Sequence, residues 1–281
     1  MVAFAYLTWL ERKGLGRLQN RYGPNRAGPF GLLQPIADLV KLVRKEAFAP
    51  SSAIDVPYIL APIVSMFTAL AAFSVIPWGP GWHIYHWDVT GEVVNVPISL
   101  LGSMRTCAQL VSYEVSLALS VLGVVILGRS LSLVDIVHRQ GVTLPFVVPQ
   151  FVGMLIFFFA GIAETSRAPF DLPEAEQELV AGYHTEYSGM RWGLFQTAEY
   201  INLITLSGLM VTLFFSGWHG PWNLGPIWFL LKLLAVLFVF IWLRATLPRL
   251  RYDQLMRFGW KVLLPLATVN AVVTAIVVAA T

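Results

Sequence analysis

Acidic side chains in or beside strongly apolar segments are the residues of this chain that could do chemistry. Glu114 lies eight residues into an apolar run, about 12 Å along a helix. An ionised carboxylate at that depth is costly, so we expect Glu114 to be neutral, paired or facing a wet cavity. Hydroxyl groups on a related face could come from Ser112, Ser116 and Ser120. The alternative is a protonated carboxyl group that only makes a structural hydrogen bond.

A second group of acids fills the segment 164–199, which we expect to be a cytoplasmic loop. It holds seven acidic residues but only Arg167 and Arg191 as bases, a net charge of −5. The acids are Glu164, Asp171, Glu174, Glu176, Glu178, Glu186 and Glu199. Because apolar side chains, tyrosines and His184 interleave with them, partial burial and mutual repulsion would separate their protonation steps, as in a proton relay. The alternatives are a solvated acidic face and, for Glu164, a surface ion pair with Arg167.

Other reactive chemistry is sparse. All histidines lie in connecting segments, so no span carries the paired ligands of a transmembrane b-type haem; they are His83, His86, His138, His184 and His219. The single cysteine, Cys107, excludes a disulfide framework, an iron–sulfur ligand set and a CxxC site. No glycine-rich phosphate loop, nucleophile elbow or zinc motif is present. We expect no metal site, and electrons for any redox reaction would have to come from a partner.

The elements that must position these acids are membrane spans. Of the 281 residues, 57% are hydrophobic and 12% charged, and the mean hydropathy is +0.67, whereas soluble domains average about 45–50% apolar and about 25% charged residues. This composition excludes a water-soluble enzyme. It predicts a single all-α, multi-pass membrane domain over residues 1–281, because backbone in lipid must satisfy its own hydrogen bonds. The apolar runs that could cross a bilayer are residues 57–77, 106–128, 145–163, 200–217, 226–243 and 262–280.

The distribution of positive charge predicts how the chain is oriented in the membrane, and it indicates that one membrane crossing is missing. Eight of the 19 lysines and arginines lie between Arg12 and Lys45, and five lie between Arg244 and Lys261, so both segments should be cytoplasmic. Five apolar runs separate them, an odd number, so one crossing is missing. We expect a whole span of about 20 or more residues to be absent near residues 94–102. Residues 1–10 likewise look like the end of a first span that lacks its beginning. The alternative is a seven-span protein that violates the charge rule.

The cytoplasmic segment 11–56 contains an amphipathic helix at residues 31–46. Its apolar face comprises Leu32, Ile36, Leu39, Val40 and Val43. Its polar face comprises Gln34, Asp38, Lys41 and Lys45. This pattern is typical of a helix that lies on the membrane surface, the alternative being a helix packed on other loops. The basic, turn-forming residues 21–29 before it would suit an entrance for an amphiphile with a polar head.

Several strings are specific when they occur together. They are LERK at residues 10–13, NRYGPN at 20–25, GLLQPIAD at 31–38, SYE at 112–114, residues 164–190 with APFDLPEAE and EYSGM, and RATLPRLRYDQ at 244–254. With them, nearly the whole chain resembles the family of H-type, quinone-site membrane subunits of the proton-pumping NADH:quinone oxidoreductase, respiratory complex I. The resemblance implies eight transmembrane helices, of which the first is truncated and the third is absent from this numbering.

The resemblance also implies a site and partners. The quinone entrance tunnel would involve Arg12, Arg21, Gln34, Asp38 and Arg244. The proton path would comprise Glu114, Glu164, Asp171, Glu174, Glu176, Glu178, Glu186 and Glu199. Ubiquinone or menaquinone would be the substrate, and FMN and iron–sulfur clusters would reside in partner subunits. The partners would be the soluble quinone-site and iron–sulfur subunits, the small membrane-arm subunits and lipid in a bacterial inner membrane, without nucleic acid.

Three other functions stay open at this point. The first is the homologous membrane component of a proton-pumping, hydrogenase-type complex, which would lack quinone. The second is a stand-alone proton-coupled transporter, against which stands the absence of a paired inverted repeat or matched broken helices. The third is a pure scaffold, which the cost of placing Glu114 inside a span disfavours.

Overall fold

The computed structural model describes residues 2–46, 55–78, 100–142, 144–165, 167, 169–170, 187–220, 225–248 and 250–280. In these residues all regular structure is helical. The helices are α1 (Val2–Leu18), η1 (Pro29–Gly31), α2 (Gln34–Arg44), α3 (Asp55–Ser74), α4 (Leu100–Gly128), α5 (Leu133–Val142), α6 (Phe151–Glu164), α8 (Met190–Phe214), α9 (Gly225–Thr246), α10 (Tyr252–Phe258), η4 (Gly259–Leu263) and α11 (Leu264–Ala280).

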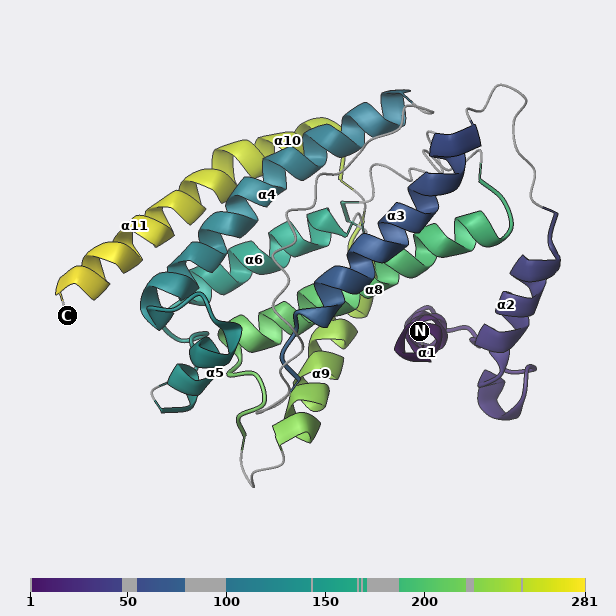
Figure 1. Cartoon of the computed structure of the whole chain (residues 1–281), viewed down its shortest axis with the longest axis horizontal. Helices are drawn as coiled ribbons and strands as arrows, with labels where there is room; N and C mark the ends of the chain where they lie inside the picture. The colour runs from purple at the N-terminus through teal and green to yellow at the C-terminus, as the bar shows by residue number, and fades with distance from the viewer. Residues whose placement is uncertain are drawn as a thin grey trace.

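Helix α8 runs through the middle of the molecule (Figure 1). It packs against α3 along much of its length, and against α9, α5, α6 and α1. Its second half is buried almost without interruption from Ile201 to Phe214. On one side of it, α4, α6 and α11 pack together as a second group (Figure 1). The fold therefore surrounds one central helix, and the residues at both ends of α8 are held by several neighbours.

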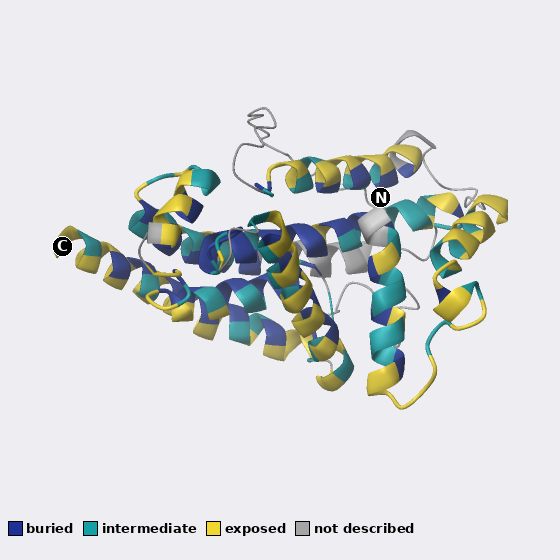
Figure 2. Cartoon of the chain, turned by 90° about the horizontal axis from the view of Figure 1, so that it is seen from below, coloured by how far each residue is buried: buried dark blue, intermediate teal, exposed yellow. Residues whose placement is uncertain are grey.

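The outward faces of the helices are apolar, as expected of a protein in lipid. Figure 2 shows buried residues where the helices meet and exposed residues along their outer sides. On α11 the exposed side chains are Leu266, Val269, Val272, Val273, Ile276 and Val277. In the described part of the chain, three helices are long and apolar enough to cross a membrane: α8, α9 and the run from Tyr252 to Ala280. The all-α membrane fold is thus confirmed.

The number of crossings stays a prediction. Helices α4 and α5 would count as one further, broken span that bends by 58°, and two more apolar helices, within α3 and α6, are shorter. Of residues 94–102, near which we expect a crossing to be missing, 94–99 lie outside the described residues and 100–102 begin α4. The helices also extend beyond the apolar runs: α1 continues past residue 10 to Leu18, and α8 begins ten residues before residue 200.

Helix α2 follows the predicted amphipathic pattern but begins at Gln34, after the short turn η1. Its apolar face is exposed, with Ile36, Leu39, Val40 and Val43 all uncovered by the described residues. An uncovered apolar stripe of this size is what a helix on a membrane surface presents. Because polar side chains of α2 are exposed as well, the position of this helix on the membrane surface stays a prediction.

The connection between α8 and α9 closes the end of the bundle farthest from Arg244. Lys232 Nζ donates hydrogen bonds to the carbonyl oxygens of Phe215, Gly217 and His219, at 2.7, 3.1 and 2.6 Å. The His219 ring lies 5.8 Å from that of His138 on α5. Burial of the His219 imidazole, then His138 and Lys232 nearby, lower the pKa of His219. Neutral His219 is therefore part of the folded structure at this end.

Candidate functional site

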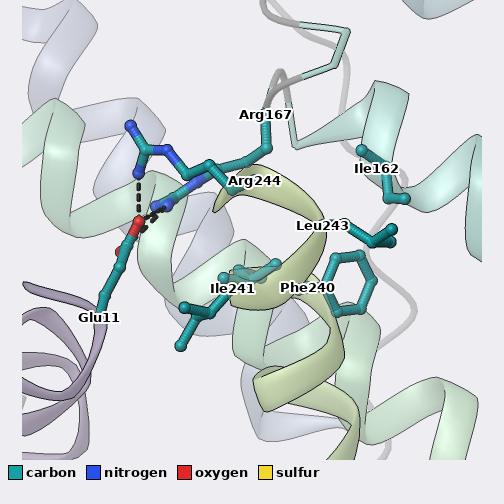
Figure 3. A pocket seen from close by; sticks show the side chains of 8 residues that line it. Glu11, Ile162, Arg167, Phe240, Ile241, Leu243 and Arg244 are labelled. Carbon is teal, nitrogen blue, oxygen red and sulfur yellow. Dashed lines mark hydrogen bonds and ion pairs between the residues drawn. The ribbon is translucent and has the colours of Figure 1, made fainter. Parts of the chain in front are cut away.

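The centre of the site is a buried carboxylate on α1, Glu11, whose side chain is only 3% exposed. Arg167 Nη1 donates hydrogen bonds to both of its oxygens, at 2.9 and 3.1 Å, and Arg244 Nη1 donates to Oε1. Figure 3 shows the two arginine side chains converging on Glu11 from different segments. Arg167 follows α6 and Arg244 lies in the last turn of α9. One carboxylate therefore joins α1, α9 and the start of the acidic segment.

Tyr200 on α8 completes this cluster. Its hydroxyl group hydrogen-bonds to Glu11, and the Arg167 guanidinium lies 4.2 Å from the centre of its ring. Burial lowers the pKa of Arg167, but Glu11, Tyr200 and Glu199 raise it by more, so its net pKa shift is upward. Arg167 is therefore a permanent buried cation that ionised Glu11 neutralises.

Two spaces adjoin the cluster. One is a closed cavity of about 10 Å³, close to the smallest space that holds a water molecule. The cavity is lined by Glu11, Ile162, Arg167, Leu203, Phe240, Ile241, Leu243 and Arg244 (Figure 3). The other, which we call the hollow, is an open space of about 380 Å³ lined by Glu11, Arg12, Leu15, Gln19, Tyr200 and Arg244. Its walls combine two guanidinium groups with an apolar and an aromatic side chain.

The structure brings the five residues expected in a quinone entrance to this hollow or to its rim. Arg12 and Arg244 line it. Arg12 Nη1 bonds to Asp38 Oδ2 at 2.6 Å, and Gln34 Nε2 donates to Asp38 Oδ1 at 3.1 Å. Arg21 Nε donates to Oε1 of Gln19, itself a lining residue, at 2.8 Å. Of the five residues, Arg12 and Arg244 thus line the hollow, Asp38 and Gln34 are linked to it through Arg12, and Arg21 is linked to it through Gln19.

The loop between α1 and α2 is held tightly against α1. Lys13 Nζ donates to the carbonyl oxygens of Pro24 and Phe30, at 3.0 and 3.1 Å, and Trp9 Nε1 also donates to that of Phe30. Gly31 has a φ of +80°, and a Cβ atom there would lie 2.3 Å from the Pro24 carbonyl oxygen. Glycine is therefore required at this turn, which fixes α2 beside the hollow.

The end of the acidic segment is anchored to α2 and α3. Ser188 Oγ donates to the Glu46 carbonyl oxygen at 3.2 Å, just beyond α2. The Tyr187 ring stacks on that of Tyr58 at 4.6 Å, and the Arg191 guanidinium lies 4.8 Å from the same Tyr58 ring. The segment that carries the predicted proton path therefore ends in direct contact with the helix beside the hollow.

The described residues of the predicted proton path occupy different environments. Glu164 ends α6, and its Oε2 atom is buried without a hydrogen-bond partner among the described residues. Arg167 bonds to Glu11, so the surface ion pair between Glu164 and Arg167 is a wrong alternative. Glu199 lies on α8, where its charge acts on Arg167. Asp171, Glu174, Glu176, Glu178 and Glu186, with His184, lie outside the described residues.

Glu114 is exposed on the surface of α4, whereas Ser112, Ser116 and Ser120 are buried. The expectation that these hydroxyl groups share a face with Glu114 is therefore wrong, because residues two apart on a helix point to different sides. Ser112 Oγ instead accepts a hydrogen bond from Trp260 Nε1 at 3.0 Å. Trp260 belongs to the π-helical segment η4, a break often found near functional sites. An exposed carboxylate at this depth needs water or a partner to cover it.

Three members of the central cluster do not follow from the sequence patterns. Among the sequence patterns, Glu11 appears only in the string LERK. The patterns do not predict that Arg167 pairs with Glu11, and they give no role to Tyr200. A signal is nevertheless present, since Glu11 is an acid placed at the end of an apolar run and followed by two bases. Its partners are 156 and 233 residues away in sequence, so local patterns do not identify them. No group of three or more histidine, cysteine, aspartate or glutamate side chains in the described part of the chain could hold a metal ion.

Fold and site together define an all-helical membrane protein with a charged hollow at one end of its bundle. A profile of the NADH dehydrogenase family matches residues 1–98 and 83–275. The chain is also 50% identical to a second H subunit of the NADH-quinone oxidoreductase of Syntrophobacter fumaroxidans (strain DSM 10017 / MPOB), over 98% of this chain and 91% of that relative. This chain belongs to the NADH dehydrogenase family and is an H-type membrane subunit of complex I, the NADH:quinone oxidoreductase enzyme.

The same comparisons bear on the predicted gap. The alignment extends over 301 positions, whereas this chain has 281 residues, so the relative must have residues with no counterpart here. The family profile matches in two pieces that meet at residues 83–98. That junction adjoins residues 94–102, where the charge argument puts the absent span. Both observations support the prediction of a missing internal segment.

Proposed function

We propose that this subunit admits quinone from the membrane through the hollow and couples its reduction to proton movement along a chain of carboxylates. The observation that carries the proposal is the grouping of Arg12 and Arg244 in one open space, with Arg12 bonded to Asp38 on the polar face of α2. The isoprenoid tail of the quinone would stay in the lipid, which the exposed apolar face of α2 suits on the other side of that helix. Guanidinium N–H groups suit the carbonyl oxygens of the headgroup.

Two of the other expected residues, Asp38 and Gln34, would orient Arg12. Arg12 donates a hydrogen bond to Asp38, Gln34 donates one to the other oxygen of Asp38, and Arg21 donates one to Gln19. Reduction of a quinone to a quinol takes two electrons and two protons. We propose that the electrons come from iron–sulfur clusters, fed by FMN, in soluble partner subunits. Ubiquinone or menaquinone would be the substrate, in a bacterial inner membrane.

The proton path would begin close to the hollow. Arg167, which is bonded to Glu11, lies near Glu199 and opens the segment that carries Asp171, Glu174, Glu176, Glu178 and Glu186. Glu164 and Glu114 would continue the path along α6 and α4. The buried Oε2 of Glu164, which has no hydrogen-bond partner among the described residues, supports this role, because a carboxyl group without a permanent partner can exchange a proton.

A hydrogenase-type function is the second candidate, and the name of the relative, which is a quinone oxidoreductase, favours quinone over it. A test is to purify the complex through a tag on this chain and to assay NADH:quinone reduction with and without quinone-site inhibitors. A photoreactive short-chain quinone should then label peptides that contain Arg12 or Arg244, and excess substrate quinone should prevent the labelling. Hydrogen evolution without quinone reduction, or labelling confined to other subunits, would contradict the proposal.

A further inference from the structure

The cluster around Glu11 contains one arginine that is fixed and one that can reach a ligand. The Arg167 side chain is 10% exposed, and Nη1 is shared between both oxygens of Glu11. The Arg244 side chain is 38% exposed and lines both the closed cavity and the hollow. Its hydrogen bond to Glu11 is made by Nη1. A guanidinium has five N–H donors, so Arg244 keeps donors for an acceptor in the hollow.

Glu11 itself is in no position to bind a ligand as an acceptor. Its carboxylate already accepts hydrogen bonds from Arg167, Arg244 and Tyr200, and its side chain is 3% exposed. The carboxylate is therefore a fixed anchor, held from two sides by buried groups. Any effect of Glu11 on a ligand would therefore pass through its partners, of which Arg244 is the charged one that is more exposed than Arg167.

We infer that Glu11 is a positioning residue for quinone binding, which holds the Arg244 guanidinium so that its remaining donors face a quinone carbonyl oxygen in the hollow. The inference rests on the proposed function and assigns to Glu11, whose carboxylate is already occupied by three donors, a role that acts through Arg244. Without the carboxylate, the long side chain of Arg244 would sample many rotamers, and two neighbouring cations would repel each other.

A double-mutant cycle separates this role from a merely structural one. Assembled complexes that carry Glu11→Gln, Arg244→Gln or both would be assayed for the apparent KM and kcat of a short-chain quinone. We expect Arg244→Gln to raise KM by about tenfold, as for the loss of one hydrogen bond from a charged group. Glu11→Gln should raise it several-fold in the native background but by less than about twofold when Arg244→Gln is present.

The outcomes distinguish the inference from the function on which it rests. If the two effects multiply, or if Glu11→Gln lowers kcat and leaves KM unchanged, Glu11 does not act through Arg244 and the inference is overturned. If Arg244→Gln leaves KM unchanged, quinone does not bind at the hollow, and the proposed function fails there as well. Asp253→Asn, which removes an exposed carboxylate paired with Arg251 at 3.6 Å, is the matched control and should change neither constant.

A variant that does not assemble would be replaced by a milder one. Glu11→Asp retains the charge that Arg167 requires but withdraws the carboxylate by one methylene group from Arg244. The same cycle with Glu11→Asp should again raise KM only when Arg244 is intact. Equal effects of Glu11→Asp in both backgrounds would overturn the inference.

Discussion

Glu11 and Arg167 form an ion pair between two nearly buried side chains, with Arg167 Nη1 at 2.9 and 3.1 Å from the two carboxylate oxygens. The residues are 156 positions apart in sequence, so the pair ties the first helix to the segment after α6. Elsewhere on the same helix, the Arg12–Asp38 pair is short but its side chains are 54% and 34% exposed. The two pairs therefore allow the stability contribution of a buried ion pair to be compared with that of an exposed one.

Removing Arg167 should be far more damaging to stability than removing Arg12. Arg167→Met leaves Glu11 with the neutral Tyr200 hydroxyl group and the more exposed Arg244, and breaking a buried pair costs about 3–5 kcal/mol. Arg12→Met breaks an exposed pair, which is worth at most about 1 kcal/mol. Thermal unfolding of the two purified variants in one detergent measures the difference. Equal losses of stability would mean that the Glu11 cluster is not a buried anchor.

Glu164→Gln should reduce proton pumping coupled to quinone reduction while the complex still assembles. The amide keeps the shape of the side chain but cannot release a proton, and losing a proton-transfer group costs roughly 10²-fold or more in rate. The measurement is turnover together with the number of protons moved per electron in vesicles. A variant with native turnover and native proton stoichiometry would remove Glu164 from the path.

Arg12→Ala should weaken the use of a long-tailed quinone more than that of a short-tailed one. Arg12 lines the open hollow, on the side that also carries α2. A group at an entrance acts on a substrate that must pass it while its tail is still in lipid. We expect the apparent KM for the long quinone to rise roughly three- to tenfold, equivalent to about 0.7–1.4 kcal/mol. The same increase for both quinones would contradict a role at the entrance.

Stability should fall on acidification through His219. Burial, His138 and Lys232 lower the pKa of His219 in the folded chain, whereas an unfolded histidine has a pKa of about 6.5. The unfolded state therefore binds more protons, so stability is complete above about pH 6.5 and is lost as the pH falls from there toward the lower folded-state pKa. Melting curves between pH 7.5 and about pH 5.5 measure this loss.

Two variants test the assignment to His219. His219→Gln should flatten the pH dependence of the melting temperature. His138→Gln removes one of the groups that lower the pKa of His219 and should weaken the dependence without abolishing it. An unchanged pH dependence in His219→Gln would assign the effect to other groups.

Much of the architecture could be predicted from the sequence because it depends on local patterns. The apolar runs, the amphipathic period of α2 and the charge asymmetry each arise within a few tens of residues. The boundaries were less predictable: α8 begins at Met190, before its apolar run, because contacts with α3 and α2 stabilise its polar first turns. A hydropathy profile depends only on the local sequence, so it does not detect contacts between distant segments.

The site was predictable only in part. Arg12, Arg21, Gln34, Asp38 and Arg244 were expected together through resemblance; Arg12 and Arg244 line the hollow, and the other three bond to its lining residues or to a partner of one, but the role of all five stays a prediction. The buried carboxylate that holds Arg244 was not predicted, because burial of Glu11 depends on segments distant in sequence. The serines near Glu114 share a buried face because they recur every four residues, and Glu114, two positions from its neighbouring serines, lies off that face.

The separation of these residues along the chain has a consequence for biosynthesis. The carboxylate of Glu11 is made first, Arg167 follows much later, and Arg244 is added only when α9 ends. Until then the newly made helices carry unmatched charges that a bilayer tolerates poorly. The cluster can therefore close only late in synthesis, once α9 has been made and while α10 and α11 are still to follow.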